Sequence, residues 1–550
     1  MLRYVLSAVI CILSVFSLRA QDREVSGRVI ARSDSMGLPG VNVVIKGTAI
    51  GTATDLEGYY SMPVPDVDSL VLVYTYVGYA RQEVFVGGRS QINIILVQDF
   101  TELQEVIVTG YKSETKADII GSITSVSAKD FEDMPVVGID QALQGQAPGV
   151  QVTQSSGTPG GGISVRVRGS TSISASNRPL FIVDGVPVED GALAMRSFGG
   201  QEDNALSTLN PNDIESIQIL KDAAAKAIYG SRAANGVVLV TTKRGTSGET
   251  TFDFDVQRGI IDITKKVDML NASQLLELQR EAVRNAGLNP DARGLIPDVT
   301  DAVDTDWLDE ILRTGILQQY QMSVRGGTKQ TRMYLSGSYR EEEGVQLNNK
   351  FERLSGTLNI DHEVSQRMNF GTNLILARTW NDRVKGDNFL DGVYSGAIKS
   401  LPYYSPFNEQ GQLVGPGSPT YAAFPNFNPV LQAVIPRFET HTTKVLGGAF
   451  VNYSFMENLT LHSKASIDYN SLIEDQFEPS TTAIGGFLPS VGGSGYGVYS
   501  TGVYATLLQS NVVTWNDSFG KHNVSALGGT EVIHRKVRSS SVEGRLFPSD

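Results

Sequence analysis

The sequence predicts a mainly β protein built in three successive parts. Residues 24–98 alternate short β-branched runs with glycines and prolines, which is the pattern of a small β-sandwich. Residues 114–245 mix short strands with two small helical patches, Ile139–Gln146 and Lys221–Tyr229. From Thr251 onward, apolar and polar residues alternate in segments of about ten residues. We therefore expect a sandwich, then an α/β domain, then a long series of antiparallel strands.

The first twenty residues have the features of a cleavable secretory signal. Arg3 precedes an apolar stretch from Tyr4 to Leu18, and the small residue Ala20 stands before a polar pair. The stretch is too short for a membrane span, so an N-terminal anchor is the weaker alternative. Because Cys11 is the single cysteine and lies inside this stretch, we expect the mature chain to form no disulfide bond.

The alternation after Thr251 is typical of membrane-spanning β-strands. It recurs with apolar residues at Phe252, Phe254, Val256, Leu354, Leu358, Ile360, Phe370, Leu374, Leu376, Val445, Ala449, Val451, Tyr453, Phe455, Leu459, Leu461, Ala465, Ile467 and Tyr469. A soluble sheet also alternates, but many such segments with aromatic residues near their ends favour a transmembrane antiparallel barrel. A closed barrel is also the only sheet that leaves no backbone group unpaired in lipid.

The connections between these segments are unequal in length. A tight turn lies at 327–331, whereas a long stretch runs from 381 to 440, as expected when the two barrel ends face different compartments. An insert at Ala272–Ala286 has apolar residues at helical spacing, among them Leu275, Leu278 and Val283. We expect this insert to be an extramembrane helix packed by its apolar face.

A short apolar run, LQEVIVTGY, stands alone at Leu103–Tyr111. Val106, Ile107, Val108 and Thr109 are strong β-formers, and charged residues flank them on both sides. An isolated strand of this kind suits a peptide that adds itself to another protein's sheet through main-chain hydrogen bonds. The alternative is a last strand of the N-terminal sandwich.

Several longer motifs resemble known families. LPGVNVVIKGT (38–48) and GTATDLEGYYSM (51–62) resemble the carboxypeptidase regulatory-like domain, an accessory module with a transthyretin-like fold. The plug of the SusC/RagA family of TonB-dependent outer-membrane transporters is similar to ALQGQAPGVQV (142–152), ISVRVRGSTSI (163–173), RPLFIVDGVPV (178–188) and LNPNDIESIQILKDAAAKAIYGSRAANGVVLVTTKRG (209–245). The similarity runs from about residue 24 to the end of the chain and includes GGTKQTRMYLSGSYREEEG (326–344).

The resemblance implies a domain order and a set of partners. The order is a signal peptide (1–20), the carboxypeptidase regulatory-like sandwich (21–98), a TonB-box linker (99–113), an α/β plug domain (114–245) and the N-terminal part of a transmembrane barrel (246–550). The TonB box, which TonB and its ExbB–ExbD motor grip, would comprise Gln104, Glu105, Val106, Ile107, Val108, Thr109 and Gly110. The family also implies insertion in outer-membrane lipid, a SusD-like surface lipoprotein as a lid, and import of an oligosaccharide or oligopeptide.

Two further groups of residues are candidate contact sites. Arg166 and Arg168 alternate with valines, so both guanidinium groups are expected on one side of a strand, where they would pair with wall carboxylates in a polar lumen. An ordinary solvated strand face is the alternative. Aromatic residues of the long loop are candidates for ligand binding, although most such residues serve loop packing: Tyr403, Tyr404, Phe407 and Tyr421.

Composition and motifs exclude several functions. The formal net charge of −13 argues against a nucleic-acid partner, and the five scattered histidines lack metal-site spacing. The chain contains no GxSxG, HExxH, P-loop or GxGxxG motif, so we expect neither an enzyme nor a cofactor. A siderophore or cobalamin receptor remains an alternative, which the N-terminal sandwich and the 209–245 motif disfavour. A non-transporting surface-binding protein would not need LQEVIVTGY.

The length of the strand region departs from the family pattern. A barrel of this type needs about 22 strands, and about 300 residues follow the plug, enough for about half of the wall. The last residues, 547–550, also lack an aromatic-ended final strand. We therefore expect a truncated or partial sequence, which alone would leave an open sheet edge.

Overall fold

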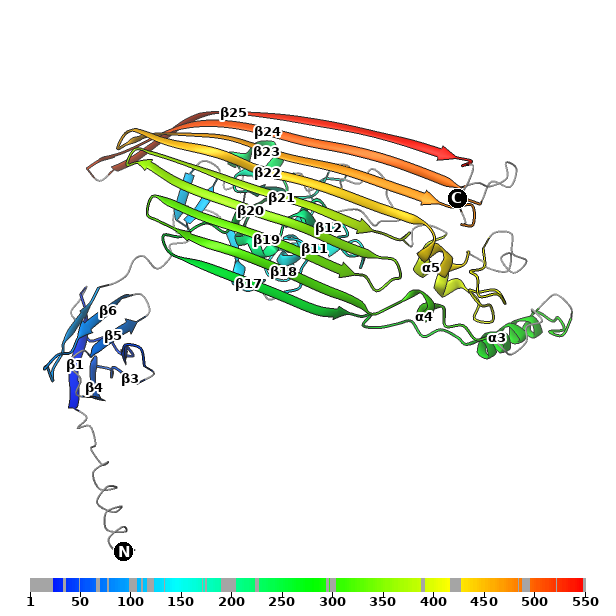
Figure 1. Ribbon diagram of the computed structural model, residues 1–550, viewed down its shortest axis with the longest axis horizontal. Helices are drawn as coiled ribbons and strands as arrows, with labels where there is room; N and C mark the ends of the chain where they lie inside the picture. Colours follow the sequence, from blue (N-terminus) through cyan, green and yellow to red (C-terminus); the bar gives the residue numbers. More distant parts are fainter. Residues whose placement is uncertain are drawn as a thin grey trace, which may run out of the picture. The chain divides into compact units, whose positions relative to one another are not determined.

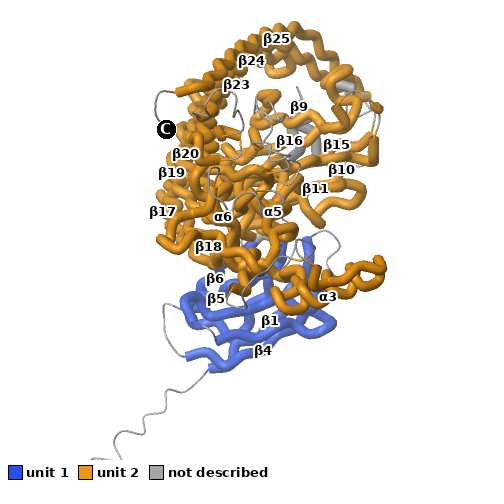
Figure 2. Tube along the Cα trace, turned by 90° about the vertical axis from the view of Figure 1, so that its right-hand side faces the viewer, with its two compact units in different colours: residues 1–108, 112–119 blue, residues 109–111, 120–550 orange. Residues whose placement is uncertain are grey.

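The computed structural model describes residues 23–547 except 33–35, 49, 66–69, 77–78, 98–105, 110–111, 116–122, 133, 171, 174–175, 189–203, 223–226, 293–295, 297–302, 387–390, 416–426, 483, 487–494 and 521. The predicted signal peptide therefore lies outside the described residues. The chain divides into two compact units, residues 1–108 with 112–119, and residues 109–111 with 120–550 (Figure 2).

The first unit contains the predicted β-sandwich. One sheet has the order β4-β1-β7 and the other has the order β3-β2-β5-β6. The strands are β1 (Arg23–Ala31), β2 (Asn42–Ile45), β3 (Gly51–Ala53), β4 (Tyr59–Val64), β5 (Val71–Tyr76), β6 (Tyr79–Phe85) and β7 (Ile94–Leu96). Alternate residues such as Val25 and Val29 on β1 point into a shared apolar core. Gly58 has φ +85°, and a Cβ there would lie 2.5 Å from the Val29 carbonyl oxygen, so the turn requires glycine.

The second unit begins with a plug-like domain around a five-stranded sheet of order β10-β15-β16-β13-β14. Its strands are β10 (Ile123–Ser127), β13 (Leu180–Val183), β14 (Val186–Pro187), β15 (Ile214–Leu220) and β16 (Val237–Thr242), and β11 (Val150–Gln154) pairs separately with β12 (Ile163–Val167). Short 3₁₀ helices join them: η1 (Ala128–Asp130), η2 (Gln141–Leu143), η3 (Ala205–Thr208), η4 (Pro211–Asp213) and η5 (Ala227–Ala233).

The first helical patch expected in this domain forms a 3₁₀ helix, and so does the described end of the second, Ala227–Tyr229. The first contracts to η2, because the backbone turns to φ +74° at Gly145 and leaves too few residues for a stable α-helical turn. The second contains η5, in which Gly230 has the non-helical angles φ 65° and ψ −155°. Part of it, residues 223–226, lies outside the described residues.

Nine long strands form one antiparallel sheet in chain order, which we call the wall (Figure 1). They are β17 (Gly248–Ile261), β18 (Gly315–Gly327), β19 (Thr331–Glu343), β20 (Lys350–Ser365), β21 (Met368–Asp382), β22 (Arg437–Met456), β23 (Leu459–Glu478), β24 (Tyr496–Phe519) and β25 (His522–Arg545). Seen from the end of the strands, the wall curves around the plug-like domain (Figure 2). The plug-like domain therefore occupies the concave side.

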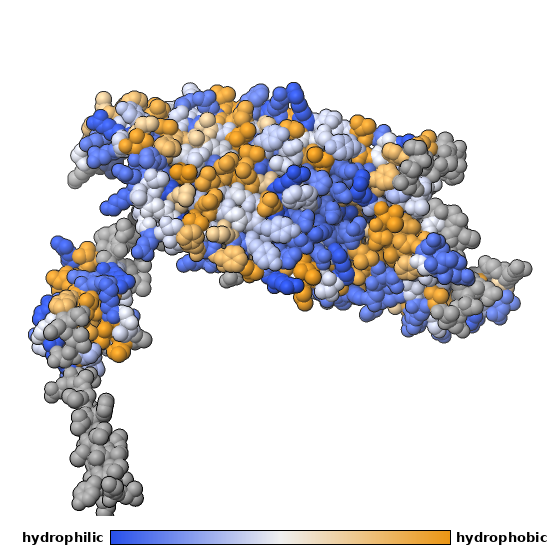
Figure 3. All heavy atoms as spheres, viewed as in Figure 1, coloured by the Kyte–Doolittle hydropathy of each residue, from blue (hydrophilic) through white to orange (hydrophobic). Residues whose placement is uncertain are grey.

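The two faces of the wall have opposite chemistry. On β18, Gln319 and Gln321 point to the concave side and are buried, whereas Tyr320 and Met322 point outward, with Met322 52% exposed. Apolar side chains accordingly appear over the strands on the outer surface (Figure 3). Polar residues inside and apolar residues outside are the reverse of a soluble sheet and match a wall that faces lipid.

Connections differ at the two ends of the wall. Short turns join β18 to β19, β20 to β21 and β22 to β23, whereas the opposite end carries residues 262–314 and 383–436. These long connections contain α3 (Ala272–Asn285), α4 (Trp307–Ile311), α5 (Val393–Lys399) and α6 (Pro429–Val434). Residues of α4, α5 and α6 share a small apolar core. None of the described helices is long and apolar enough to cross a membrane.

The structure confirms that α3 forms and refines the expectation of how it packs. The helix forms as predicted, with Asn271 as N-cap and Gln274 completing a capping box. However, none of its residues is buried, and Leu278 is 52% exposed. The expected packing of its apolar face is therefore only partial: Leu275 and Val283 are half-buried, and Gln279 donates to Tyr403 Oη at 3.2 Å. Helical periodicity predicts an apolar stripe but not how fully other elements cover it.

Candidate functional site

The interface between the plug-like domain and the wall is the candidate functional site. The largest apolar core of the second unit combines plug residues such as Val183 and Ile217 with Ile375 of β21 and Leu446 of β22. Around these contacts, polar side chains of the wall bind two turns of the plug. The interface therefore joins a small apolar contact to extensive hydrogen bonding.

The turn Asn210–Asp213 is the first polar contact. Pro211 begins η4, and the Asn210 side chain accepts a hydrogen bond from the Asn212 amide, which caps this short helix. The turn places the buried Asp213 carboxylate against the wall. Three donors from adjacent strands bind that carboxylate: Tyr334 Oη of β19 at 2.8 Å, Thr357 Oγ1 of β20 at 2.7 Å and Gln321 Nε2 of β18 at 3.2 Å.

A buried arginine of the wall holds two plug loops together. Arg353 of β20 is 0% exposed. Its Nη1 donates to the carbonyl oxygens of Val137, Ser207 and Leu209 at 2.7, 2.9 and 3.0 Å. Its Nη2 donates to Asn210 Oδ1 at 3.2 Å. Hydrogen bonds from a charged donor are about twice as strong as neutral ones, so this side chain is a major fastening of the plug.

A second wall arginine extends this contact. Arg340 of β19 donates to the carbonyl oxygens of Pro135 and Val136, both at 3.2 Å. It also donates to Gln319 Oε1 at 3.0 Å and pairs with Glu342 at 2.6 Å. At this contact, Arg340 and Arg353 of the wall supply the cations, and the plug supplies mainly carbonyl acceptors.

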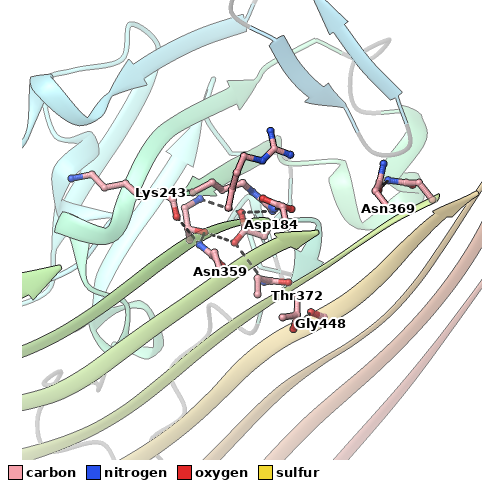
Figure 4. Close-up of polar contacts among 12 residues, drawn as sticks. Asp184, Lys243, Asn359, Asn369, Thr372 and Gly448 are labelled. Atoms are coloured by element: carbon pink, nitrogen blue, oxygen red, sulfur yellow. Dashed lines mark hydrogen bonds and ion pairs between the residues drawn. The ribbon is translucent and has the colours of Figure 1, made fainter. Parts of the chain in front are cut away.

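Asp184 centres the third polar contact, at the turn between β13 and β14 (Figure 4). Its carboxylate accepts from Thr242 Oγ1 at 2.6 Å and from the Thr242 amide at 3.1 Å. Lys464 of β23 donates to the Asp184 carbonyl oxygen. Asn359 of β20 donates to Thr242 Oγ1 at 2.9 Å and to the Lys243 carbonyl oxygen at 2.6 Å. β23 therefore binds the Asp184 turn, and β20 binds the end of β16, to which Asp184 is hydrogen-bonded.

A buried carboxyl group links the plug loops that Arg353 contacts. Asp140 accepts from Asn204 Nδ2 at 2.8 Å and from the Gln141 amide at 3.0 Å. Burial raises the pKa of Asp140 to about 6, because the charged form loses its hydration. The loops before η2 and before η3 are thereby tied to each other as well as to the wall.

The two arginines expected to contact the wall are placed elsewhere. Arg166 on β12 is exposed, and within the described part of the chain no ion pair involves it. Arg168 has φ 59°, which breaks the alternation of the strand, and it pairs with Asp222 and the Lys221 carbonyl oxygen inside the plug. Among the described contacts, wall carboxylates therefore do not bind these two arginines. Arg340 and Arg353 of the wall, and Arg244 of the plug, which pairs with Asp361 of β20 at 3.0 Å, make cationic contacts that sequence reasoning missed.

One signal for the two missed wall arginines was present in the sequence. Each lies at an inward position of a strand whose inward neighbours are small and polar, as Ser355 is beside Arg353. An arginine side chain at such a position faces neither lipid nor bulk solvent, so it requires a hydrogen-bonding partner inside the lumen. Which plug atoms it reaches depends on loops more than 140 positions away in sequence.

The isolated apolar run contains a strand. Val106–Thr109 forms β8, which pairs with β9 (Lys112–Thr115) in a two-stranded sheet. This sheet is separate from both sheets of the sandwich. The other residues of the predicted TonB box, Gln104, Glu105 and Gly110, lie outside the described residues. That TonB binds this strand stays a prediction.

The loop aromatics have unlike surroundings. Tyr403 is buried, its hydroxyl accepts from Gln279 Nε2 at 3.2 Å, and its ring centre lies 5.0 Å from that of Tyr404. Burial, with a smaller contribution from Tyr403, raises the pKa of Tyr404. Phe407 is exposed, and Tyr421 lies outside the described residues. Their role in ligand binding stays a prediction.

Comparison with known proteins matches a known domain family to part of each unit. Residues 115–237 match the TonB-dependent receptor plug domain, and residues 25–108 match the CarboxypepD_reg-like domain. TonB-dependent receptor P3 of Formosa agariphila is 34% identical over 521 residues, which are 93% of this chain and 48% of that protein. TonB-dependent receptor SusC of Bacteroides thetaiotaomicron is 33% identical over 344 residues, which are 62% of this chain and 32% of that protein.

A solved structure extends the likeness to the fold. The RagAB peptide importer in its open-open state superposes with a TM-score of 0.65 at 27% identity, over 80% of this chain and 50% of that one. The chain spans about half the length of the curated relatives it matches. The nine strands accordingly make about half of a barrel wall, which confirms the predicted incomplete barrel.

These matches confirm the resemblance on which the family assignment depends. The two domain matches cover the sandwich and the plug, and SusC-like and RagA-like relatives cover most of the chain. The chain belongs to the TonB-dependent receptors, and it carries their plug domain behind a carboxypeptidase regulatory-like domain.

Proposed function

We propose that this protein imports an oligosaccharide or oligopeptide across the outer membrane by energised transport. The observation that carries the proposal is the polar fastening of the plug, in which Arg353 and Asp213 bind across the interface. Water can replace such hydrogen bonds at a small net free-energy cost, so the plug can leave the wall and return. The likeness to a peptide importer supports a peptide cargo, and the likeness to SusC supports this transporter class.

The proposed mechanism begins at the linker strand. The short turns of the wall face the periplasm and the long connections face outside, as in other outer-membrane barrels. TonB, driven by ExbB–ExbD, adds a strand to Val106–Thr109 and pulls, since main-chain pairing gives a firm grip on an extended segment. A SusD-like lipoprotein covers the outer opening and retains cargo. Residues 1–20 direct the chain into the periplasm and are removed.

Disabling the linker strand tests the proposal. Deleting Glu105–Gly110 in cells that make this transporter is expected to abolish uptake of labelled cargo while surface binding persists. Ile107→Pro should also abolish uptake, because proline removes an amide donor and disfavours strand pairing. Ile107→Val is the matched control and should retain uptake. Undiminished uptake in the deletion variant contradicts energised transport through this strand.

A further inference from the structure

A cavity lies among the long connections of the wall, away from the plug interface. Its volume is about 600 Å³, within the usual range of about 300–1,000 Å³ for ligand sites. It is bounded by the segment that precedes α3, the start of α4 and the end of α5. Figure 3 shows apolar surface at this end of the molecule. The apolar lining includes Val267, Leu275, Leu308, Ile398, Leu401 and Pro402.

The segment at the rim of this cavity has an unpaired main chain. Residues 264–270 are exposed and belong to neither a helix nor a strand. Within the described part of the chain, their amides and carbonyls make no hydrogen bonds, whereas those next to them do: the Ile263 amide donates to Asp262 and the Asn271 amide to Gln274. We call residues 264–270 the rim segment.

Contacts at two points hold the rim segment beside the cavity. Lys266 forms an ion pair with Asp309 of α4. Just beyond the segment, the Ala272 amide donates to Asp304 Oδ1 at 2.8 Å. Unpaired main chain that is exposed and anchored at both ends can accept an incoming strand, because each added residue gains main-chain hydrogen bonds.

The lining suits aliphatic side chains better than sugar. Trp307 is almost fully buried, and its indole Nε1 already donates to the Leu401 carbonyl oxygen at 3.0 Å, so it offers no open ring face. Asp306 caps α4 by accepting from the Leu308 and Asp309 amides. The lining also carries polar side chains, among them Asp268, Asn271 and Lys399. A sugar would further need an open aromatic face to stack on, whereas an apolar side chain gains from burial alone.

We propose that the rim segment and its cavity capture an extended oligopeptide. The peptide main chain pairs with residues 264–270, and one apolar side chain enters between Val267 and Ile398. This inference rests on the proposed import function and narrows its cargo to peptides with apolar residues. It places the first contact with cargo on the outer loops, above the lumen.

Binding to the protein extracted in detergent from the outer membrane tests the capture site. The probe is a fluorescein-labelled pentapeptide of alternating leucine and serine, followed by fluorescence anisotropy. Ile398→Gln, at a site 37% exposed, should raise Kd at least tenfold because the cavity mouth becomes polar. Val267→Pro should do the same by removing an amide of the rim segment. Val267→Ile and Leu288→Gln are matched controls and should leave Kd unchanged.

Competition separates the possible occupants. Unlabelled leucine–serine peptide should displace the probe, whereas an all-serine peptide and maltohexaose should not. Equal displacement by maltohexaose, or unchanged Kd in both cavity variants, overturns the proposal. So does loss of a co-purifying lipoprotein from the cavity variants with peptide binding intact, since the surface would then belong to that partner. These assays need no TonB, so their failure leaves the uptake result with the linker deletion unaffected.

Discussion

The N-terminal sandwich and the plug are both small β-domains, yet they are stabilised in different ways. The sandwich core draws every buried residue from within the domain, between Val25 and Leu96. The plug core also includes Ile375 and Leu446 of the wall. The plug further buries Asp213 against wall donors, whereas the sandwich keeps its charged pairs, such as Lys46 with Glu83, at the surface.

This difference indicates which interactions stabilise each domain, and how easily those interactions can be exchanged for water. Apolar burial contributes about 25 cal/mol per Å², and all of it is lost when the faces separate in water. Hydrogen bonds across a polar interface exchange for bonds to water at a net cost of about 1 kcal/mol each. A domain that stays folded alone therefore needs its own apolar core, and a domain that must leave a barrel is better held by polar contacts.

We expect the largest effect on folding stability when the sandwich and the plug are each produced as separate fragments. A fragment of residues 21–98 should unfold cooperatively in urea, because its core is complete, although small domains of this size are only marginally stable. A fragment of residues 114–245 keeps most of its core but loses Ile375, Leu446 and the polar contacts of the wall, so it should unfold at a lower urea concentration than the 21–98 fragment. Circular dichroism during urea titration measures both midpoints. A midpoint for the second fragment at or above that of the first would show that the wall is dispensable for the plug.

Removing the buried wall arginine should loosen the plug. Arg353→Met leaves the carbonyls of Val137, Ser207 and Leu209 without their donor, at a cost of about 3 kcal/mol. Hydrogen exchange of amides 204–213 should accelerate, and a large antibiotic should enter the cells more readily. Arg81→Met, at an exposed arginine of the sandwich, is the matched control and should change neither. Equal protection in both variants would contradict the fastening role.

Acidification should strengthen the plug through Asp140. Its pKa is raised from 3.8 to about 6, so the folded plug holds this proton more tightly than the unfolded chain. The stabilisation is complete below about pH 4 and is lost as the pH rises through about 6. Amides 137–143 should be less protected at pH 7 than at pH 5, by about 1 kcal/mol after correction for intrinsic exchange. Asp140→Asn should remove this pH dependence, and persistence of it would assign the effect to another group.

An ion pair on the surface of the sandwich should have the smallest effect on stability. The Lys46 ammonium lies 2.6 Å from Glu83 and lowers the pKa of that carboxyl, but both groups are exposed and screened by solvent. Glu83→Gln should leave the urea midpoint of the 21–98 fragment unchanged within error. A clear fall in the midpoint would mean that surface charge, and not the apolar core, stabilises this domain.

Much of the fold was predictable because its signals are local. Alternation on β20 and β22 predicted strands and the face that each residue takes, since side chains in a strand alternate regardless of distant contacts. The outcome for Arg168 was not predictable, because its left-handed backbone turns the side chain toward Asp222 instead of along the face shared with Arg166.

By itself, the sequence determined the order of the domains, the strand pattern, the inward and outward faces of the wall and the family resemblance, because each depends on neighbouring residues or on contiguous motifs. Only the tertiary structure decided that Arg353 binds Val137, 216 positions away, that α3 is only partly covered, and that a cavity forms beside residues 264–270. These outcomes depend on contacts between segments that are far apart in the sequence, and local periodicity does not specify such contacts.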